Sequence, residues 1–343
     1  MNNYDWALQL FAKLLLKAYV ILVSQSDLER LLPMREAVEV MRKGFRTYRA
    51  SDWDIPVRSM LPLGKVPKSV LLMPVYSHRH RRLYTKIVLV HTGAAHRGWH
   101  ATAVCTVWDG ATGTPLLVCD GTYATALRTA AASGLAAKLM ARPSSRISVL
   151  IGAGYQGQFQ LDAVASLFHL EKAFVVDRST DKAVEVAKRA AARWKIEVAV
   201  ASSTGEAVRQ ADIVLAATDS LTPVFDGHDL QPGTHVSSIG SYRPDMRELD
   251  EVALRGARIV VDSEEHTPRE SGDVIDALSQ GAKILGDLAW LVRNPGVARQ
   301  SDADITIYKS AGFGLLDALL LEALYDMYLR SQHIGAQAGV VAE

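Results

Sequence analysis

Two patterns of apolar and polar positions divide the chain. In its first part, short β-like runs such as SVLLMPVYS, LYTKIVLVH and PLLVCD alternate with turn residues. The segment DGATGTP is typical of a β-hairpin, because Gly and Asp accept the positive φ of tight turns. Helical patterns over 26–32 and 34–50 precede these strands, and a helix over about 122–140 follows them. This part is therefore predicted to be an α+β domain with a mostly antiparallel sheet.

Continuous apolar strands that alternate with helices follow the sequence RPSS. ISVLIG, AFVVD and EVAVA are predicted strands, separated by helices over 155–170 and 181–194, and DIVLAA, HVSSIG and RIVVD follow a helix near Glu206. The strands of a parallel sheet are covered by helices on both faces and so lack polar alternation. The second part is predicted to be a Rossmann-type doubly wound parallel sheet, and the fold class is α/β.

A division into two domains fits the length of 343 residues, which exceeds the usual size of one hydrophobic core. The strand ITIYKS and the apolar helix over 313–328 are expected to return to the first domain. The predicted domains are thus residues 1–142 with 305–343, and residues 143–304. Hydrophobic residues make up 49% of the chain, which indicates large buried surfaces and room for a subunit interface.

The charge balance and the cysteines narrow the function. With 38 basic and 37 acidic residues, the net charge of +1 provides no overall field for nucleic acid or an anionic membrane, so a small ligand is expected. Cys105 and Cys119 form no CxxC motif, and no His cluster has metal-ligand spacing. The sequence therefore predicts neither a disulfide framework nor a metal site. It predicts a cytoplasmic location.

The first residues, MNNYDWALQLFAKLLLK, are predicted to form an amphipathic helix over about 4–17. Charged residues interrupt its apolar run, its start lacks positive charge, and no small-residue cleavage site follows. Packing against the body or a partner subunit is expected rather than membrane attachment.

A glycine-rich motif, VLIGAGYQGQF, lies between a predicted strand and a predicted helix. In a GxGxxG loop the glycines allow the tight turn, the approach of a pyrophosphate and close helix packing. The candidate cofactor-binding residues of this loop are Gly152, Ala153, Gly154, Tyr155, Gln156 and Gly157. Asp177 ends the next strand, where a carboxylate accepts hydrogen bonds from the adenosine ribose, so the pattern predicts a dinucleotide.

The segment VVDRST leaves the choice between NAD and NADP open. Asp177 favours NAD because a carboxylate repels a 2′-phosphate, whereas Arg178 and Ser179 offer charge-assisted hydrogen bonds to that phosphate. Use of both cofactors is expected. A methyltransferase also uses a glycine-rich loop and a strand-end acid, so the fold alone does not settle the chemistry.

Three basic residues of the first domain are candidates for holding an acidic substrate. Arg58 follows Ile55-Pro56, Lys86 lies inside an apolar strand, and Arg128 lies on a helix of small residues. A structural role remains open for each of them, since long basic side chains also extend from apolar surfaces to solvent.

Several segments together resemble the ornithine cyclodeaminase and mu-crystallin family: DGTYATALRTAAASGLAAKLMARP, VLIGAGYQGQFQLDAV, IPVRS, YTKIVLV and YKSAGFGLLDAL. The resemblance covers about 20–329 and implies a homodimer whose first domain binds substrate and dimerises. It also implies that Arg58 and Arg128 bind the substrate carboxylate, and that Lys86 lies beside the reacting carbon as a proton donor or polariser. Thr218 matches the position that meets the nicotinamide end of the cofactor.

One segment departs from the cyclodeaminases of that family. They carry a GGDxPGKxEL-like segment, whereas this chain has IGSYRPDMREL, which places Tyr242 at the aspartate position and makes it a candidate substrate-binding residue. The resemblance therefore favours an NAD(P)H-dependent reductase of cyclic 2-imino acids, such as Δ1-pyrroline-2-carboxylate or Δ1-piperideine-2-carboxylate. The alternatives are an alanine-dehydrogenase-like enzyme acting on a 2-oxo acid, an ornithine cyclodeaminase, and a ligand-binding protein without turnover.

Overall fold

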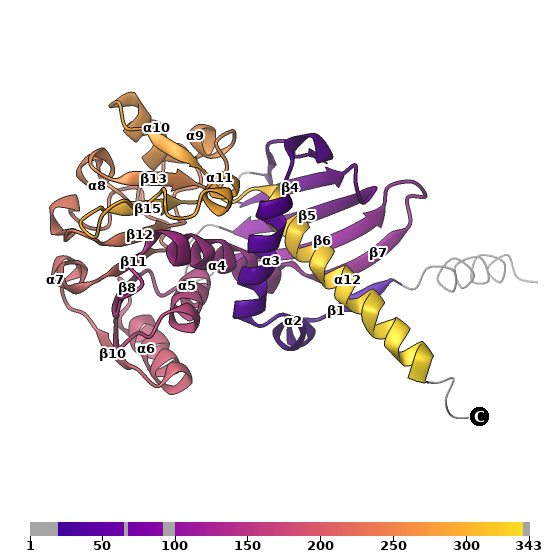
Figure 1. Ribbon diagram of the computed structural model, residues 1–343, viewed down its shortest axis with the longest axis horizontal. Helices are drawn as coiled ribbons and strands as arrows, with labels where there is room; N and C mark the ends of the chain where they lie inside the picture. The colour runs from indigo at the N-terminus through magenta and orange to yellow at the C-terminus, as the bar shows by residue number, and fades with distance from the viewer. Residues whose placement is uncertain (1–19, 65–67, 92–99, 339–343) are drawn as a thin grey trace, which may run out of the picture. The chain divides into compact units, whose positions relative to one another are not determined.

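The computed structural model describes residues 20–64, 68–91 and 100–338. They belong to two compact units (Figure 1). The first unit lies within residues 1–32, 49–125 and 317–343, and the second comprises residues 33–48 and 126–316. The helix expected over 4–17 lies outside the described residues. The domain boundaries expected from the sequence stay a prediction.

In the part of the first unit that the structure describes, a mostly antiparallel sheet of seven strands forms the centre. Its strands are β1 (Ile21–Val23), β2 (Trp53–Asp54), β3 (Ser59–Pro62), β4 (Lys68–Ser77), β5 (Arg82–His91), β6 (His100–Asp109) and β7 (Pro115–Asp120). Their order is β1-β7-β6-β5-β4-β2, with β3 also paired to β4, and among the strand pairings of the described residues the β1–β7 pairing is parallel while the others are antiparallel. The expected hairpin joins β6 to β7, and the Asp109 carboxylate accepts the amides of Ala111 and Thr112 in its turn. The predicted α+β domain is confirmed.

The long helix α12 (Gly314–Ala338) covers one face of this sheet from Asp317 onward (Figure 1). The Glu322 carboxylate accepts a hydrogen bond of 2.6 Å from Arg82 and another from the Tyr84 hydroxyl. Burial and the Glu322 charge raise the pKa of Tyr84, so its hydroxyl remains a donor. The short helices α2 (Gln25–Leu31) and η1 (Ala50–Asp52) complete the first unit.

The second unit contains an eight-stranded, fully parallel sheet of order β10-β9-β8-β11-β12-β15-β13-β14. Its strands are β8 (Ile147–Ile151), β9 (Lys172–Val176), β10 (Glu197–Val200), β11 (Ile213–Ala216), β12 (His235–Ser238), β13 (Arg258–Val261), β14 (Ile284–Asp287) and β15 (Thr306–Lys309). The chain winds outward from β8 in one direction and from β11 in the other, as in a doubly wound sheet. The predicted Rossmann-type fold is confirmed.

Helices cover both faces of the parallel sheet. They are α3 (Met34–Thr47), α4 (Gly121–Met140, in this unit from Ala126), α5 (Tyr155–Leu167), α6 (Thr180–Trp194), α7 (Thr204–Gln210), α8 (Glu251–Arg255), α9 (Thr267–Glu270), α10 (Gly272–Ser279) and α11 (Leu288–Arg293), with the short turn η3 (Gly227–Asp229). One buried apolar cluster lies under α5 and α6, and another lies under α7, α8 and α10. The small residues of α4 allow it to lie against α5, because a Cβ at Gly134 would be 3.2 Å from that of Ala163.

One strand differs from its expected place. The segment ITIYKS forms β15, which pairs with β12 and β13 near the middle of the second sheet instead of returning to the first domain. All residues of β15 are buried. The residues of a buried strand do not indicate which sheet the strand joins. Its place depends on whether two other strands, distant in sequence, leave room for it between them.

Candidate active site

The glycine loop after β8 forms a cradle at the carboxyl edge of the parallel sheet. Gly152 has φ +101°, and its amide donates a 2.8 Å hydrogen bond to the Val176 carbonyl. Gly157 lies against the Gly152 carbonyl with no space for a Cβ, whereas a Cβ at Gly154 would meet nothing within 4 Å. Open space above Gly154 at the start of the 13-residue helix α5 fits a pyrophosphate, which the helix N-terminus attracts.

The loop after β11 lies beside this cradle. β8 and β11 are neighbours at which the winding direction changes, and ligands of doubly wound folds bind at that position. A Cβ on Gly152 would lie 3.0 Å from Cγ2 of Thr218. Thr218 therefore lies at the switch point, as expected for a residue that contacts the cofactor.

The residues after β9 hold the glycine loop from the other side. The Asp177 carboxylate accepts the Ala153 amide at 2.7 Å and the Ser179 amide at 2.8 Å. Arg178 is 90% exposed in its side chain and donates a 3.0 Å hydrogen bond to Asp219. The acid is thus fixed by backbone amides, while the arginine extends to solvent at the same edge of the sheet.

Arg128 lies on α4 and is 4% exposed. Its guanidinium approaches the backbone after β15: a Cβ on Gly312 would lie 3.1 Å from Nη1 and 3.3 Å from Nη2. Gly312 has φ +76°, and its amide donates a 2.7 Å hydrogen bond to the buried Asp262. The second unit therefore holds the cofactor candidates and one of the two arginine candidates.

The first unit places Lys86 on β5, where its side chain points to the face covered by α12 and is 1% exposed. Its Nζ lies 2.7 Å from Oδ2 and 3.0 Å from Oδ1 of Asp317, which is itself 4% exposed. Asp317 is a candidate site residue that the sequence reasoning missed. Asp317 was missed because it lies 231 residues from Lys86 in the sequence. The available signal was an acidic residue within the apolar segment GLLDAL.

Arg58 and Tyr242 are the remaining candidates. Arg58 lies in the first unit just before β3 and is half-buried. Tyr242 lies in the second unit after β12, half-buried, with the Arg243 guanidinium 5.8 Å from its ring centre. Asp245, the nearest following acid, is exposed and paired with Arg243 at 3.0 Å. The Asp245 carboxylate is therefore engaged in an ion pair with Arg243 at the protein surface.

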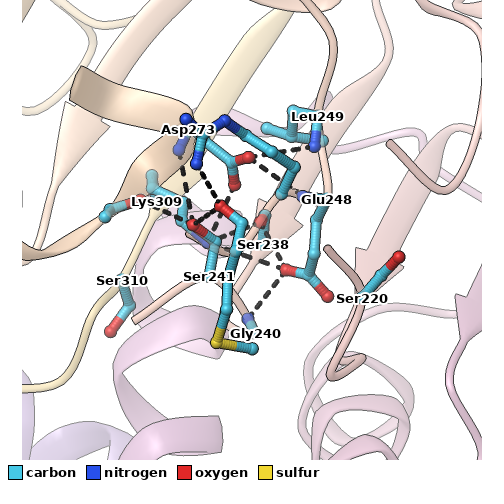
Figure 2. A network of polar contacts seen from close by, with 12 residues as sticks. Ser220, Ser238, Gly240, Ser241, Glu248, Leu249, Asp273, Lys309 and Ser310 are labelled. Carbon is cyan, nitrogen blue, oxygen red and sulfur yellow. Dashed lines mark hydrogen bonds and ion pairs between the residues drawn. The ribbon is translucent and has the colours of Figure 1, made fainter. Parts of the chain in front are cut away.

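A buried network that the sequence reasoning also missed surrounds Glu248 (Figure 2). Glu248, Asp273 and Lys309 have no exposed surface, although all three carry ionisable side chains. The desolvation that accompanies burial raises the pKa of Asp273, against the opposing effect of Lys309.

Within 20–64, 68–91 and 100–338 no cluster of His, Cys, Asp and Glu side chains could hold a metal ion. Over the same residues no helix is sufficiently long and apolar to cross a membrane.

The fold and the glycine cradle define a dinucleotide-binding protein of the Rossmann type. Within that class the chain belongs to the ornithine cyclodeaminase/mu-crystallin family, whose model matches residues 19–332. The family expected from the sequence motifs is thus confirmed.

Three similar proteins each cover 80% or more of this chain. The structure of Thermococcus litoralis Δ1-pyrroline-2-carboxylate reductase in complex with NADH and L-proline has a TM-score of 0.85 and 34% identity, over 91% of this chain and 98% of that one. The ketimine reductase mu-crystallin of Macropus fuliginosus is 33% identical over 80% of this chain and 85% of its own. An archaeal alanine dehydrogenase dimer with bound NAD has a TM-score of 0.81 and 29% identity, over 91% of this chain and 97% of that one.

Proposed function

We propose that the protein is an NAD(P)H-dependent reductase that converts cyclic 2-imino acids, such as Δ1-pyrroline-2-carboxylate, into L-amino acids. The observation that carries this proposal is the glycine cradle beside Thr218, in a chain whose relatives include reductases of this kind. These relatives confirm the predicted class, an oxidoreductase that acts on C=N bonds, and the predicted nicotinamide cofactor.

The proposed roles follow from the chemistry of an imino acid. A nicotinamide cofactor supplies a hydride to the imine carbon. Arg128 and Arg58 bind the carboxylate, because guanidinium groups form bidentate hydrogen bonds with that shape. Lys86 donates a proton to the imine nitrogen, and Asp317 fixes the position of its ammonium group at 2.7 Å. Tyr242 lines the substrate pocket, and Gly152–Gly157, Asp177, Arg178, Ser179 and Thr218 bind the cofactor.

An alanine-dehydrogenase-like reaction is the second candidate, favoured by the likeness to the archaeal alanine dehydrogenase. The same lysine and arginines would hold an open 2-oxo acid and its imine. Ring-closing deamination of ornithine has less support, because Tyr242 stands at the aspartate position and the Asp245 carboxylate pairs with Arg243.

A spectrophotometric panel tests the proposal. Wild-type protein is mixed with NADH or NADPH and with Δ1-pyrroline-2-carboxylate, Δ1-piperideine-2-carboxylate, or pyruvate with ammonia. The expected result is fast oxidation with a cyclic imine, and a large loss in Arg128→Ala and Lys86→Met. Turnover with pyruvate and ammonia alone would favour the second candidate. No oxidation with any substrate would overturn both and support a ligand-binding role.

We further propose that both NAD and NADP serve as cofactors. Asp177 is held by the amides of Ala153 and Ser179 at the end of β9, and in this role its carboxylate would accept the ribose hydroxyls of NAD. Arg178 is largely exposed and pairs with Asp219, which an incoming 2′-phosphate would replace as the stronger anionic partner.

We also propose that the first unit forms a homodimer through the sheet face that α12 leaves uncovered. Leu72, Ile87 and Val104 form a cross-strand row on this face and are 38%, 45% and 42% exposed. An apolar row of this kind marks an interaction surface, and the alanine dehydrogenase relative is a dimer.

Light scattering after gel filtration tests the dimer. Ile87→Glu should give monomers, because it would bury a charge in the interface. Val200→Glu, on edge strand β10 with 38% exposure, should leave the dimer intact. A dimeric Ile87→Glu variant would contradict the assignment of this face.

A cytoplasmic location is part of the proposal. Cys105 and Cys119 are buried as free thiols on paired strands. The neighbouring Cys119 thiol and burial raise the pKa of Cys105, so the thiol form is favoured. Two unbridged cysteines in register fit a reducing compartment.

A further inference from the structure

Glu248 receives hydrogen bonds from two loops at the carboxyl edge of the parallel sheet. Its Oε1 accepts the Thr218 amide at 2.6 Å and the Thr218 hydroxyl at 3.0 Å. Its Oε2 accepts the Gly240 amide at 2.7 Å and the Ser238 hydroxyl at 2.6 Å. A carboxylate has about four lone-pair positions, so these donors occupy all of its acceptor capacity.

The two loops touch at the point where Glu248 binds them. Gly240 lies against the Thr218 carbonyl and the Glu248 carboxylate with no space for a Cβ. Thr218 follows β11, and Gly240 follows β12, its neighbour in the sheet. Glu248 therefore joins the ends of adjacent strands into one rigid edge.

Two buried charges fix Glu248 in turn (Figure 2). Lys309 at the end of β15 donates to the Ser238 hydroxyl at 2.8 Å and lies 3.6 Å from Glu248 Oε2 and 3.2 Å from Asp273 Oδ2. Asp273 on α10 accepts the backbone amides of Glu248 at 2.9 Å and Leu249 at 3.3 Å. Both the side chain and the backbone of Glu248 are thus held.

Stability alone does not account for this arrangement. Removing two carboxylates and an ammonium group from water is costly, and apolar residues of similar size often replace buried ion pairs without loss of stability. A charged acceptor does provide a fixed position for several donors at once. The network binds Thr218, which lies at the switch point where the nicotinamide half of the cofactor is expected.

We propose that Glu248 is a positioning residue for hydride transfer, which holds the loops of Thr218 and Gly240 as one surface for the nicotinamide half of the cofactor. Lys309 and Asp273 fix Glu248 itself. This inference rests on the proposed function for its kinetic consequence only. Its structural consequence, rigid amides at Thr218 and Gly240, holds in the protein without cofactor.

The test compares Glu248→Gln with the wild type. A glutamine amide accepts hydrogen bonds through its oxygen and donates them through its nitrogen. Its NH2 group would therefore lie against one of the two donor pairs, either that of Thr218 or that of Gly240 and Ser238, and could not accept their hydrogen bonds. The matched control is Asp212→Asn, because the Asp212 carboxylate also accepts two backbone amides, those of Arg146 and Ile147, at the opposite edge of the same sheet.

Hydrogen exchange of the cofactor-free protein is the first measurement. We expect the Thr218 and Gly240 amides to exchange as slowly in the wild type as those inside β11, and much faster in Glu248→Gln but not in Asp212→Asn. Fast exchange of both amides in the wild type would overturn the proposal even if the variant does not fold.

Kinetics with Δ1-pyrroline-2-carboxylate and deuterated NADH is the second measurement. A misplacement of about 1 Å costs about 100-fold in rate. We expect kcat to fall by that order and the hydride isotope effect to rise in Glu248→Gln, while the Kd for NADH from fluorescence titration changes by much less. Unchanged kcat and isotope effect in the folded variant would overturn the proposal. A wild type that binds NADH and reduces no imine contradicts the proposed function instead, and the exchange data still decide the role of Glu248.

Discussion

Replacing Gly312 by alanine tests the role of Arg128 without removing any atom from the arginine. In the structure the Gly312 backbone has φ +76°, and the added Cβ would lie 3.1 Å from Nη1 and 3.3 Å from Nη2 of Arg128. Van der Waals contact at these positions needs a few tenths of an ångström more. The guanidinium must therefore move, and Arg128 has little freedom to do so because it is 4% exposed.

The expected magnitude has two separable parts. The left-handed backbone conformation costs a residue with a Cβ about 1–2 kcal/mol, which lowers stability and leaves substrate affinity unchanged. Displacing the guanidinium weakens a hydrogen bond to a charged group, worth about 1.5–3 kcal/mol. Converted to a rate ratio, the second part predicts a fall in kcat/KM for the imino acid of about 10- to 100-fold.

Gly296→Ala separates these two parts. Gly296 has φ +86°, and a Cβ there meets nothing within 4 Å, so the control bears the backbone cost without the contact. We expect similar losses of thermal stability in both variants, a raised KM for the cyclic imine in Gly312→Ala alone, and an unchanged Kd for NADH in both. Steady-state kinetics, fluorescence titration and thermal melts provide these values.

A wild-type KM in folded Gly312→Ala would refute the reasoning. Either the guanidinium then tolerates the Cβ without moving, or Arg128 does not bind the substrate carboxylate. Arg128→Ala distinguishes these explanations, because it removes the carboxylate contact directly. A loss of NADH affinity in Gly312→Ala would show that the backbone after β15 contributes to cofactor binding.

The other predictions concern stability, proton donation and cofactor choice. Burial lowers the pKa of His235 to about 3, whereas a histidine of the unfolded chain has a pKa of about 6.5, so the folded state loses stability as the pH falls below about 6.5. Urea unfolding should therefore show about 2 kcal/mol less stability at pH 5 than at pH 7 from this group, and the difference should be absent in His235→Gln. Asp317→Asn should lower stability by about 3–5 kcal/mol and reduce kcat, whereas Asp326→Asn on the same helix, where the side chain is 43% exposed, should change neither in melts and assays. Arg178→Ala should raise the KM for NADPH about tenfold and leave that for NADH nearly unchanged.

Local patterns predicted the parts of the molecule that depend on neighbouring residues. The GxGxxG loop, the acid at Asp177 and the hairpin after β6 were predicted because each requires particular residues within a short segment. The alternation of strands and helices predicted the parallel sheet for the same reason, and the structure confirms it. The proposed roles of Arg58, Lys86 and Tyr242 came from family motifs and stay predictions.

Pairings between distant segments were not accessible to the same reasoning. Asp317 approaches Lys86 across 231 residues, and Lys309 approaches Ser238 across 71. In the sequence a buried acidic residue cannot be distinguished from a surface one, because its burial depends on which distant segments cover it. The place of β15 was missed for a related reason, because a buried strand shows its burial and not its neighbours.

Glycines at the carboxyl edge of the parallel sheet connect these observations. Gly152, Gly240 and Gly312 follow β8, β12 and β15, and a Cβ on each would collide with or crowd a neighbouring loop or the Arg128 guanidinium. The edge is therefore shaped by contacts that glycine alone permits, and buried charges such as Glu248 hold those contacts in place. Alanine at any of the three positions adds one methyl group, yet it changes the geometry of the proposed site. Substitutions chosen to rigidify glycine-containing loops should accordingly reduce activity at this edge and be tolerated where a Cβ meets open space, as at Gly296.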